Sequence, residues 1–303
     1  MLRAALFAAA GNGPLRRFAH RHGMSLGARR FVAGETLDDF IPVARRLNQR
    51  GMRVAAGLLG EGIRDADEAR RAGLAYQAML ARIAGERLDA DVALKLTHLG
   101  LDVDAAAAYE NVRAVVERAR AAQNFVRLDM EQSVYVDKTL DAYRHLRAAG
   151  YSNVGVVLQS YLRRSQDDLS NLLSIEPNVR LVKGAYLEAP AVAFAKKTDV
   201  DENFAGLVER SLRGGGFTAI ATHDDRLIER AIRFIRANEV VDARYEFQML
   251  YGVRAGLQAS LVDRGFPVRV AVPFGTQWYP YLMRRLAERP ANLMFFVRSL
   301  WRA

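Results

Sequence analysis

The chain has 303 residues, of which 50% are hydrophobic and 26% are charged, a composition typical of a folded globular protein. Its 44 basic and 34 acidic residues give a formal net charge of +10, which permits a nucleic acid, an anionic membrane surface or an anionic ligand as a partner. Cysteine is absent, which excludes disulfides, thiolate nucleophiles, iron–sulfur clusters and cysteine-ligated zinc. No apolar run approaches the ~20 residues that a membrane-spanning helix needs.

The first ten residues, MLRAALFAAA, resemble the start of a secretory signal peptide. Their apolar stretch is short, however, and several arginines follow it closely, whereas an export signal has a longer apolar region. We therefore expect residues 1–50 to form a helical segment packed on the rest of the protein, and we expect the protein to be cytoplasmic.

Eight short runs with the composition of strands follow along the chain, and each precedes a longer segment with apolar residues at steps of three and four. The predicted strands are residues 53–58, 92–96, 125–128, 154–158, 179–182, 217–221, 245–248 and 268–272. The predicted helices between them include residues 65–85, 104–122, 139–149 and 225–238. Asp65, Asp104 and Asp225 are the expected N-caps.

This alternation predicts a (β/α)8 barrel of the TIM type rather than an open doubly wound sheet, because the chain beyond residue 50 is close to that fold's usual ~250 residues. No glycine fingerprint for a dinucleotide follows any predicted strand. No low-complexity linker or change in composition divides the chain. We therefore expect a single domain overall, with the catalytic barrel spanning residues 51–303.

In such a barrel the active site lies at the carboxyl ends of the strands. The residues predicted at or just beyond those ends are mostly polar, carry both signs of charge and come from every strand. In chain order they are Glu61, Lys95, His98, Asp129, Met130, Glu131, Gln159, Lys183, Thr222, His223, Asp224, Glu246, Gln248, Tyr281, Arg284 and Arg285.

Some of these residues also have an ordinary structural explanation. Lys95 is placed within the second predicted strand, where a lysine is more often ion-paired than catalytic. Arg284 and Arg285 belong by default to a solvated helix face, although Arg284 shares that face with Tyr281. The pattern of charges by itself leaves these alternatives open.

A metal site is a further hypothesis. His98, His223 and Glu246 could ligate a metal ion together, but no HxH or HExxH spacing supports this arrangement. His223 and Asp224 could equally form a helix-capping pair. We therefore predict no metal centre.

Seven segments resemble the proline dehydrogenase family, and they span nearly the whole predicted barrel in the family's order. They are KLTHLGL (95–101), RLDME (127–131), VVLQSYLRR (156–164), VRLVKGAY (179–186), ATHD (221–224), YEFQMLYGVR (245–254) and YLMRRLAERPAN (281–292). The chain is most similar to the short, monofunctional bacterial members, and VRLVKGAY and YLMRRL are the most specific of its motifs.

The resemblance implies a distorted barrel that binds FAD non-covalently over the carboxyl ends of its strands, with the last helix placed over the barrel mouth. It implies oxidation of L-proline to Δ1-pyrroline-5-carboxylate by hydride transfer to flavin N5, the first step of proline degradation to glutamate. It further implies that a membrane quinone accepts the electrons, and that the enzyme is coupled functionally to pyrroline-5-carboxylate dehydrogenase.

The same resemblance assigns roles to individual residues. The flavin contacts fall on Met130, Gln159, Arg180, Lys183, Gly184, Ala185, Thr222 and His223. Proline is contacted by Lys95, Tyr281, Arg284 and Arg285, whose three cations form an anion clamp for the substrate carboxylate.

Asp129 and Arg180 are the implied functional pair beneath the reacting centre. An aspartate close to several cations is a poor base, so we expect Asp129 to organise Lys95 and the flavin surroundings. Glu61 is expected to form an ion pair with Arg284 that closes over the bound substrate. The alternative for Glu61 is that it caps the turn that follows it.

Two positions depart from the family's pattern. Ala271 stands in AVPFG where the family usually carries a tyrosine, and this puts strict selection against hydroxyproline in doubt. Gly57 stands where family members tend to carry an aspartate, and we expect this change not to affect the chemistry.

The sequence leaves two other functions open. A barrel aldolase or isomerase could use Lys183 as a Schiff-base amine, which requires a desolvated lysine and no flavin. A nucleic-acid-binding protein would need its arginines on one face, whereas here they are spread over nearly every predicted helix.

The last residues, 292–303, read NLMFFVRSLWRA. They suit either an interfacial helix on anionic lipid, which would bring the protein into peripheral contact with the inner face of the cytoplasmic membrane, or a terminal helix docked on the barrel.

Overall fold

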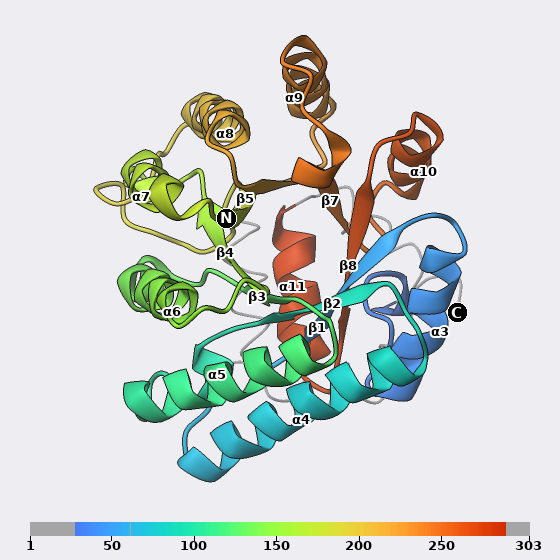
Figure 1. The fold of residues 1–303 in the computed structure, drawn as a ribbon, viewed down its shortest axis with the longest axis vertical. Helices are drawn as coiled ribbons and strands as arrows, with labels where there is room; N and C mark the ends of the chain where they lie inside the picture. The colour runs from blue at the N-terminus through green and yellow to red at the C-terminus, as the bar shows by residue number, and fades with distance from the viewer. Residues whose placement is uncertain (1–27, 61, 289–303) are drawn as a thin grey trace.

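The computed structural model describes residues 28–60 and 62–288, and its framework is a closed barrel of eight parallel strands in chain order (Figure 1). The strands are β1 (Arg53–Leu58), β2 (Ala90–Leu94), β3 (Val126–Leu128), β4 (Val154–Gln159), β5 (Asn178–Val182), β6 (Phe217–Ala221), β7 (Tyr245–Leu250) and β8 (Val268–Phe274). β8 pairs with β1 and thereby closes the sheet. The predicted barrel is confirmed, and every strand begins and ends within two residues of its predicted bounds.

Helices alternate with the strands, and all the described helices except the last form the outer layer (Figure 1). They are α3 (Leu37–Asn48), α4 (Ala66–Gly85), α5 (Ala105–Ala121), α6 (Val136–Ala148), α7 (Ser165–Leu172), α8 (Lys197–Arg213), α9 (Asp225–Ala237), α10 (Ala255–Asp263) and α11 (Trp278–Glu288). Short 3₁₀ turns occur at η1 (Ala28–Arg30), η2 (Thr97–Leu99), η3 (Ser133–Tyr135), η4 (Leu173–Ile175) and η5 (Asp242–Arg244). Parallel neighbours need a crossover connection, and the crossover helix packs back on the sheet.

Two of the three predicted N-caps are confirmed. Asp65 and Asp104 accept hydrogen bonds from backbone N–H groups in the first turns of α4 and α5. The third prediction is wrong by one residue, because Asp224 caps α9 and Asp225 is the first helical residue. Asp224 has the extended backbone that lets its carboxylate accept a hydrogen bond from the N–H of Arg226.

The hydrophobic core lies between the strands and the helices, where outward-pointing strand residues such as Val54 and Val92 are fully buried. The interior of the barrel is polar by contrast. Asp91 on β2 contacts Arg269 on β8 at 3.3 Å, although β1 lies between these two strands. Such a contact is only made through the inside of the barrel, so both side chains point inward.

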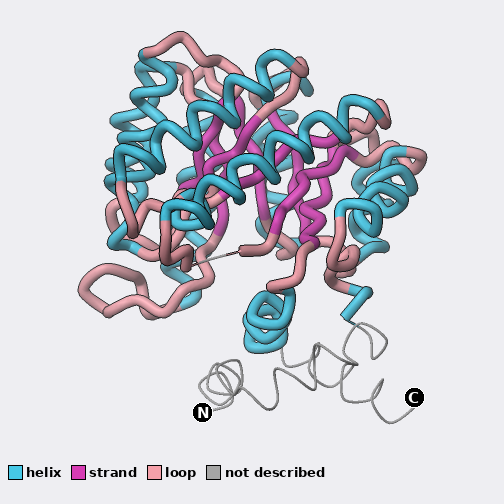
Figure 2. The backbone as a smooth tube through the Cα atoms, turned by 90° about the horizontal axis from the view of Figure 1, so that it is seen from below, coloured by secondary structure: helices cyan, strands magenta, loops and turns pink. Residues whose placement is uncertain are grey.

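The last described helix, α11, lies across the mouth of the barrel. Figure 1 places it over the barrel centre, and Figure 2 shows it beyond the ends of the strands. Trp278, Leu282 and Met283 of this helix form a small separate core with Phe31 and Val32, next to η1. The helix placed over the barrel mouth, which the resemblance implied, is confirmed.

Several expectations fall on residues outside the described ranges. They are the signal-like start of the chain, residues 1–27 of the expected helical segment 1–50, Glu61, and the segment 292–303. Within the described part of residues 1–50, α3 begins with a capping box of Thr36 and Asp39 and contacts β1 and β8. Across the ranges that the structure describes, no helix is both long enough and apolar enough to cross a bilayer.

Candidate active site

A cavity of about 600 Å³ opens at the carboxyl ends of the strands. Every predicted cofactor or substrate contact whose side chain the structure describes lies in its wall. These residues are Lys95, Asp129, Met130, Gln159, Arg180, Lys183, Gly184, Ala185, Thr222, His223 and Tyr281. Arg284 and Arg285 are residues of α11, but their side chains lie outside the described part of the chain.

A second cavity, of about 630 Å³, lies at the opposite, amino-terminal end of the barrel. Its charged lining consists of Arg53 and Asp242, and the remaining lining residues are apolar or glycine. Because parallel barrels carry their chemistry at the carboxyl ends of the strands, the first cavity is the candidate active site.

Lys95 is not placed as predicted. β2 ends at Leu94, so Lys95 is the first residue beyond the strand and not a residue within it. The strand stops here because the chain turns into η2, where Glu131 holds Thr97. The buried Glu131 carboxylate accepts hydrogen bonds from Thr97 N at 3.1 Å and from Thr97 Oγ1 at 2.5 Å. This clamp joins the loop that carries Lys95 to the loop that carries Asp129.

Asp129 and Arg180, the expected functional pair, are in contact. Arg180 Nη1 donates to Asp129 Oδ1 at 2.7 Å, and Arg180 Nε donates to Gln248 Oε1 at 2.5 Å. The Arg180 side chain is 9% exposed and that of Asp129 is 30% exposed. The guanidinium is therefore held on two sides, in the floor of the cavity.

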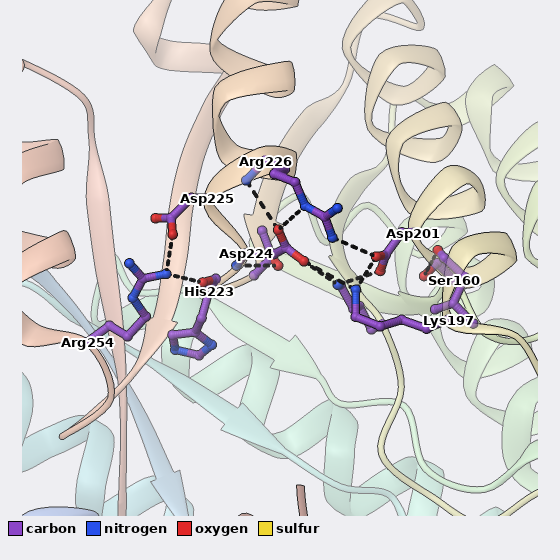
Figure 3. Close-up of polar contacts among 11 residues, drawn as sticks. Ser160, Lys197, Asp201, His223, Asp224, Asp225, Arg226 and Arg254 are labelled. Carbon is purple, nitrogen blue, oxygen red and sulfur yellow. Dashed lines mark hydrogen bonds and ion pairs between the residues drawn. The ribbon is translucent and has the colours of Figure 1, made fainter. Parts of the chain in front are cut away.

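Lys183 belongs to a cluster of charges at the rim, of which Figure 3 labels Lys197, Asp201 and Asp224. Its Nζ donates to Asp201 Oδ1 at 2.5 Å and to Asp224 Oδ2 at 3.2 Å, and Lys197 contacts the same two carboxylates. Burial favours the neutral form of these carboxyl groups, but the two ammonium groups outweigh it and hold the pKa of Asp201 and of Asp224 below the ordinary value. A lysine engaged in this way does not offer the desolvated amine that Schiff-base chemistry requires.

His223 is fixed in one orientation. Its Nε2 accepts a hydrogen bond from the N–H of Leu250 at 2.9 Å, so a neutral imidazole carries its proton on Nδ1. Its carbonyl oxygen accepts from Arg254, which also pairs with Asp225 at 2.7 Å (Figure 3). The ring is therefore held by the backbone of Leu250, and the backbone of His223 is held by the side chain of Arg254.

The three residues of the metal hypothesis are not brought together. His98 Nδ1 lies 3.0 Å from the hydroxyl of Tyr76, His223 is bound to Leu250, and Glu246 lies deep in the barrel. No group of three aspartate, glutamate or histidine side chains that could hold a metal is formed within the ranges that the structure describes.

The wall of the cavity has features that fit a large polar cofactor. Gln159 Oε1 and Arg180 Nη2 are buried and have no hydrogen-bond partner within the described part of the chain. Gly184 has φ +109°, and a Cβ there would lie 2.1 Å from the ring of Tyr161. Glycine therefore lets the loop after β5 pack closely against Tyr161 at the edge of the cavity.

Two cationic residues of the cavity wall were not among the predicted site residues. Lys197, at the start of α8, and Arg254, before α10, both face the cavity. Arg254 ends the segment YEFQMLYGVR, so that motif carried a signal for it. Lys197 carried none, because its place depends on the fold of the long loop after β5.

A closed parallel barrel with a charged cavity at the carboxyl ends of its strands is the architecture of a (β/α)8-barrel enzyme. A family model for proline dehydrogenase matches residues 40–298. The chain belongs to the proline dehydrogenase family, whose members are oxidoreductases acting on proline.

Curated relatives agree over nearly the full length. The chain is 40% identical to proline dehydrogenase 2 of Bacillus subtilis strain 168, with 95% of both chains covered. It is 38% identical to a proline dehydrogenase of Deinococcus radiodurans, covering 90% of this chain and 89% of the relative.

A solved structure is similar as well. It is proline utilization A from Bdellovibrio bacteriovorus inactivated by N-propargylglycine, with a TM-score of 0.81 and 25% identity. The match covers 87% of this chain but only 32% of that larger protein. The similarity to monofunctional bacterial relatives, which the sequence motifs indicated, is confirmed.

Proposed function

We propose that the protein binds FAD non-covalently in the cavity and oxidises L-proline to Δ1-pyrroline-5-carboxylate, with a membrane quinone as the final electron acceptor. The observation that carries this proposal is the wall itself. It combines buried polar atoms on Gln159 and Arg180 that have no partner among the described residues, a loop after β5 that packs tightly at Gly184, and a set of fixed cations.

The residues that would hold the cofactor come from β3 to β6 and the loops after them. They are Met130, Gln159, Arg180, Lys183, Gly184, Ala185, Thr222 and His223. When bound, the flavin supplies a hydride acceptor at N5, while the protein contributes binding, orientation and electrostatics.

The substrate would be held by its carboxylate. Lys95 and Tyr281 lie in the cavity wall, and Arg284 and Arg285 follow Tyr281 along α11. Several fixed cations bind one carboxylate strongly, and clamping one end of a small ring orients its opposite C–H bond. In this proposal, α11 brings the substrate-binding side chains over the mouth.

Arg180 would stabilise negative charge that develops beside it during the reaction, because a fixed cation in a water-poor site favours an electron-rich neighbour. Asp129 accepts a hydrogen bond from Arg180 at 2.7 Å, so its carboxylate is already engaged. We therefore assign Asp129 the role of organising Arg180 and Lys95, not that of a base.

Further parts of the proposal concern the surroundings of the site. Glu61 would pair with Arg284 and close the mouth over the substrate. Residues 1–50 would pack on the 51–303 barrel as one domain in the cytoplasm. The protein would touch the membrane peripherally to reach the quinone, and its product would pass to pyrroline-5-carboxylate dehydrogenase.

One measurement tests the proposal. Purified full-length protein is expected to be yellow, and anaerobic addition of L-proline is expected to bleach it, with pyrroline-5-carboxylate formed in equal amount to the flavin reduced. A colourless active protein, or a yellow protein that proline leaves oxidised, would refute it. D-proline is the matched control, because a clamp built for one enantiomer presents the wrong hydrogen of the other.

A further inference from the structure

A chain of polar contacts leads from the cavity into the interior of the barrel. Arg180 Nε donates to Gln248 Oε1 at 2.5 Å, and Gln248 Nε2 donates to Glu246 Oε1 at 2.5 Å. The same oxygen of Glu246 accepts from Arg269 Nε at 2.7 Å. Gln248 and Glu246 are two residues apart on β7, so both side chains point to the same side of the strand.

Glu246 lies one layer of inward-pointing side chains deeper than the cavity wall. It is 1% exposed and absent from the cavity wall, whereas Gln248 and Arg180 are in that wall. Glu246 therefore cannot touch a bound ligand, and any influence it has on the reaction must pass through the side chains it contacts.

The orientation of the Gln248 amide decides whether Arg180 finds an acceptor. An amide has an oxygen on one side and an NH₂ group on the other, a guanidinium has only donors, and a carboxylate has only acceptors. A flipped amide would set its NH₂ against Arg180 and its oxygen against Glu246, and would lose both hydrogen bonds. Glu246 thus holds the amide in the one orientation that binds Arg180.

The charge of Glu246 is maintained despite its burial. Burial favours the neutral form, but the positive charge of Arg269 and the hydrogen bonds from Arg269 and Gln248 outweigh it, so the pKa of Glu246 lies below the ordinary value for glutamate. A carboxylate that stays ionised stays an acceptor.

Arg180 depends on this contact for its direction. Its Nη1 is bound to Asp129 at 2.7 Å and its Nε to Gln248, while the buried Nη2 has no partner within the described residues. Two contacts on a planar group fix where its third nitrogen lies. Without Gln248, the guanidinium would be held by Asp129 alone.

We propose that Glu246 is a positioning residue for proline oxidation, because through the amide of Gln248 it fixes the direction in which Arg180 presents its guanidinium to the cavity. The inference rests on the proposed function, in which Arg180 lies beside the flavin. It concerns a group that contacts neither substrate nor cofactor.

The test compares two substitutions of the same residue by the midpoint potential of the bound flavin. Glu246→Gln and Glu246→Met both remove the charge, but only Glu246→Met removes the acceptor for the Gln248 amide. Glu246→Met should lower the potential by about 30 mV, the equivalent for a two-electron couple of a tenfold weaker preference for the reduced flavin. It should also lower kcat about tenfold and leave the KM for proline unchanged.

Glu246→Gln should keep the wild-type potential or raise it, because losing a nearby negative charge by itself favours the electron-rich, reduced flavin. The two substitutions therefore move the potential differently. An equal upward shift in both would show that only the charge of Glu246 matters, and would overturn the proposal.

Asp91 provides the matched control, because it contacts the same Arg269 at 3.3 Å and does not contact Gln248. Asp91→Asn should leave the potential at or above the wild-type value, and a drop as large as that of Glu246→Met would assign the effect to Arg269 instead. If Glu246→Met fails to fold, Gln248→Met removes the same amide, and a wild-type potential in that variant would overturn the proposal.

The measurements distinguish a wrong proposed function from a wrong positioning role for Glu246. A wild-type protein without flavin, or with flavin that proline does not reduce, contradicts the proposed function. A wild-type protein that proline reduces, together with an unchanged potential in Glu246→Met, contradicts only the positioning role.

Discussion

The indole Nε1 of Trp278 donates a hydrogen bond to Oε1 of Glu35 at 2.7 Å, which ties the first turn of α11 to the segment just before α3. Trp278 is fully buried and packs with Phe31 and Val32. The helix over the barrel mouth is thus anchored in the part of the chain that precedes the first strand. Loss of this anchor should loosen the helix that carries Tyr281.

The first prediction follows from that anchor. Trp278→Phe should destabilise the fold by about 2–3 kcal/mol, from the lost hydrogen bond and the space left by the smaller ring, and should raise the KM for proline. Thermal unfolding and steady-state kinetics measure the two effects. Glu35→Gln keeps an acceptor and should behave like wild type, whereas Glu35→Ala should share the KM effect. An unchanged KM in both Trp278→Phe and Glu35→Ala would separate α11 from substrate binding.

The carboxylate clamp gives the second prediction. Arg284→Met or Arg285→Met should each cost about 1.5–3 kcal/mol of substrate binding, or roughly ten- to a hundredfold in kcat/KM, because one charge-assisted contact is lost. Most of the effect should appear in KM, and both variants should purify with full flavin. Arg118→Met, on the exposed side of α5, is the control. Near-normal KM values would place the clamp elsewhere.

Ala271 gives the third prediction. It lies in the cavity wall, and the two large residues that could fill the space beside it are engaged elsewhere. Phe274 packs on Phe40 with ring centroids 5.1 Å apart, and Trp278 is bound to Glu35. We expect Ala271→Tyr to increase discrimination against trans-4-hydroxyproline, by at most about a hundredfold, since a pocket rejects one added hydroxyl only modestly. The ratio of kcat/KM for proline and hydroxyproline measures it, and an unchanged ratio would contradict the idea.

Gly184 gives the fourth prediction. Its φ of +109° and the ring of Tyr161, 2.1 Å from where a Cβ would lie, mean that Gly184→Ala must displace the loop after β5. The variant should bind flavin at least tenfold more weakly, as measured by the flavin-to-protein ratio after dialysis. Gly256→Ala, in α10 with open space around it, is the control and should be neutral or slightly stabilising. Full flavin content in Gly184→Ala would show that the native course of the loop after β5 is not required for flavin binding.

The rim cluster gives the fifth prediction, which concerns pH. Lys183 and Lys197 hold the pKa of Asp201 below its ordinary value, so its contribution to stability is present above the unfolded pKa and is lost as pH falls through the folded one. The difference in unfolding free energy between wild type and Asp201→Asn should be about 1.5 kcal/mol from pH 5 to 8 and should shrink below about pH 4. Denaturant titrations at several pH values measure it, with Asp199→Asn, an exposed neighbour on α8, as control. A difference that grows toward acid pH would contradict this assignment.

The alternation of strands and helices was readable from the sequence because it depends on local patterns. Buried parallel strands are short apolar runs, helices repeat their apolar residues at three and four, and Asp65 and Asp104 cap helices within their own first turn. The order of the elements then leaves few topologies open, and the barrel places the carboxyl ends of all strands on one face. Candidate site residues could therefore be chosen from position along the chain, with the motifs narrowing the choice.

What only the tertiary structure decided are the partners of those residues. Arg180 binds Asp129, which is 51 residues away in the chain, and Gln248, which is 68 residues away. Lys183 donates a hydrogen bond to Asp224, which is 41 residues away. A local pattern specifies which way a strand residue points, but a hydrogen bond between strands depends on the register and closure of the whole barrel. The end of β2 before Lys95 was misplaced for the same reason, because it is set by the contact of Thr97 with Glu131, which exists only once distant segments have come together. The cap of α9 was misplaced by one residue for a local reason, because, of two adjacent aspartates, it is Asp224 that accepts the hydrogen bond from the N–H of Arg226.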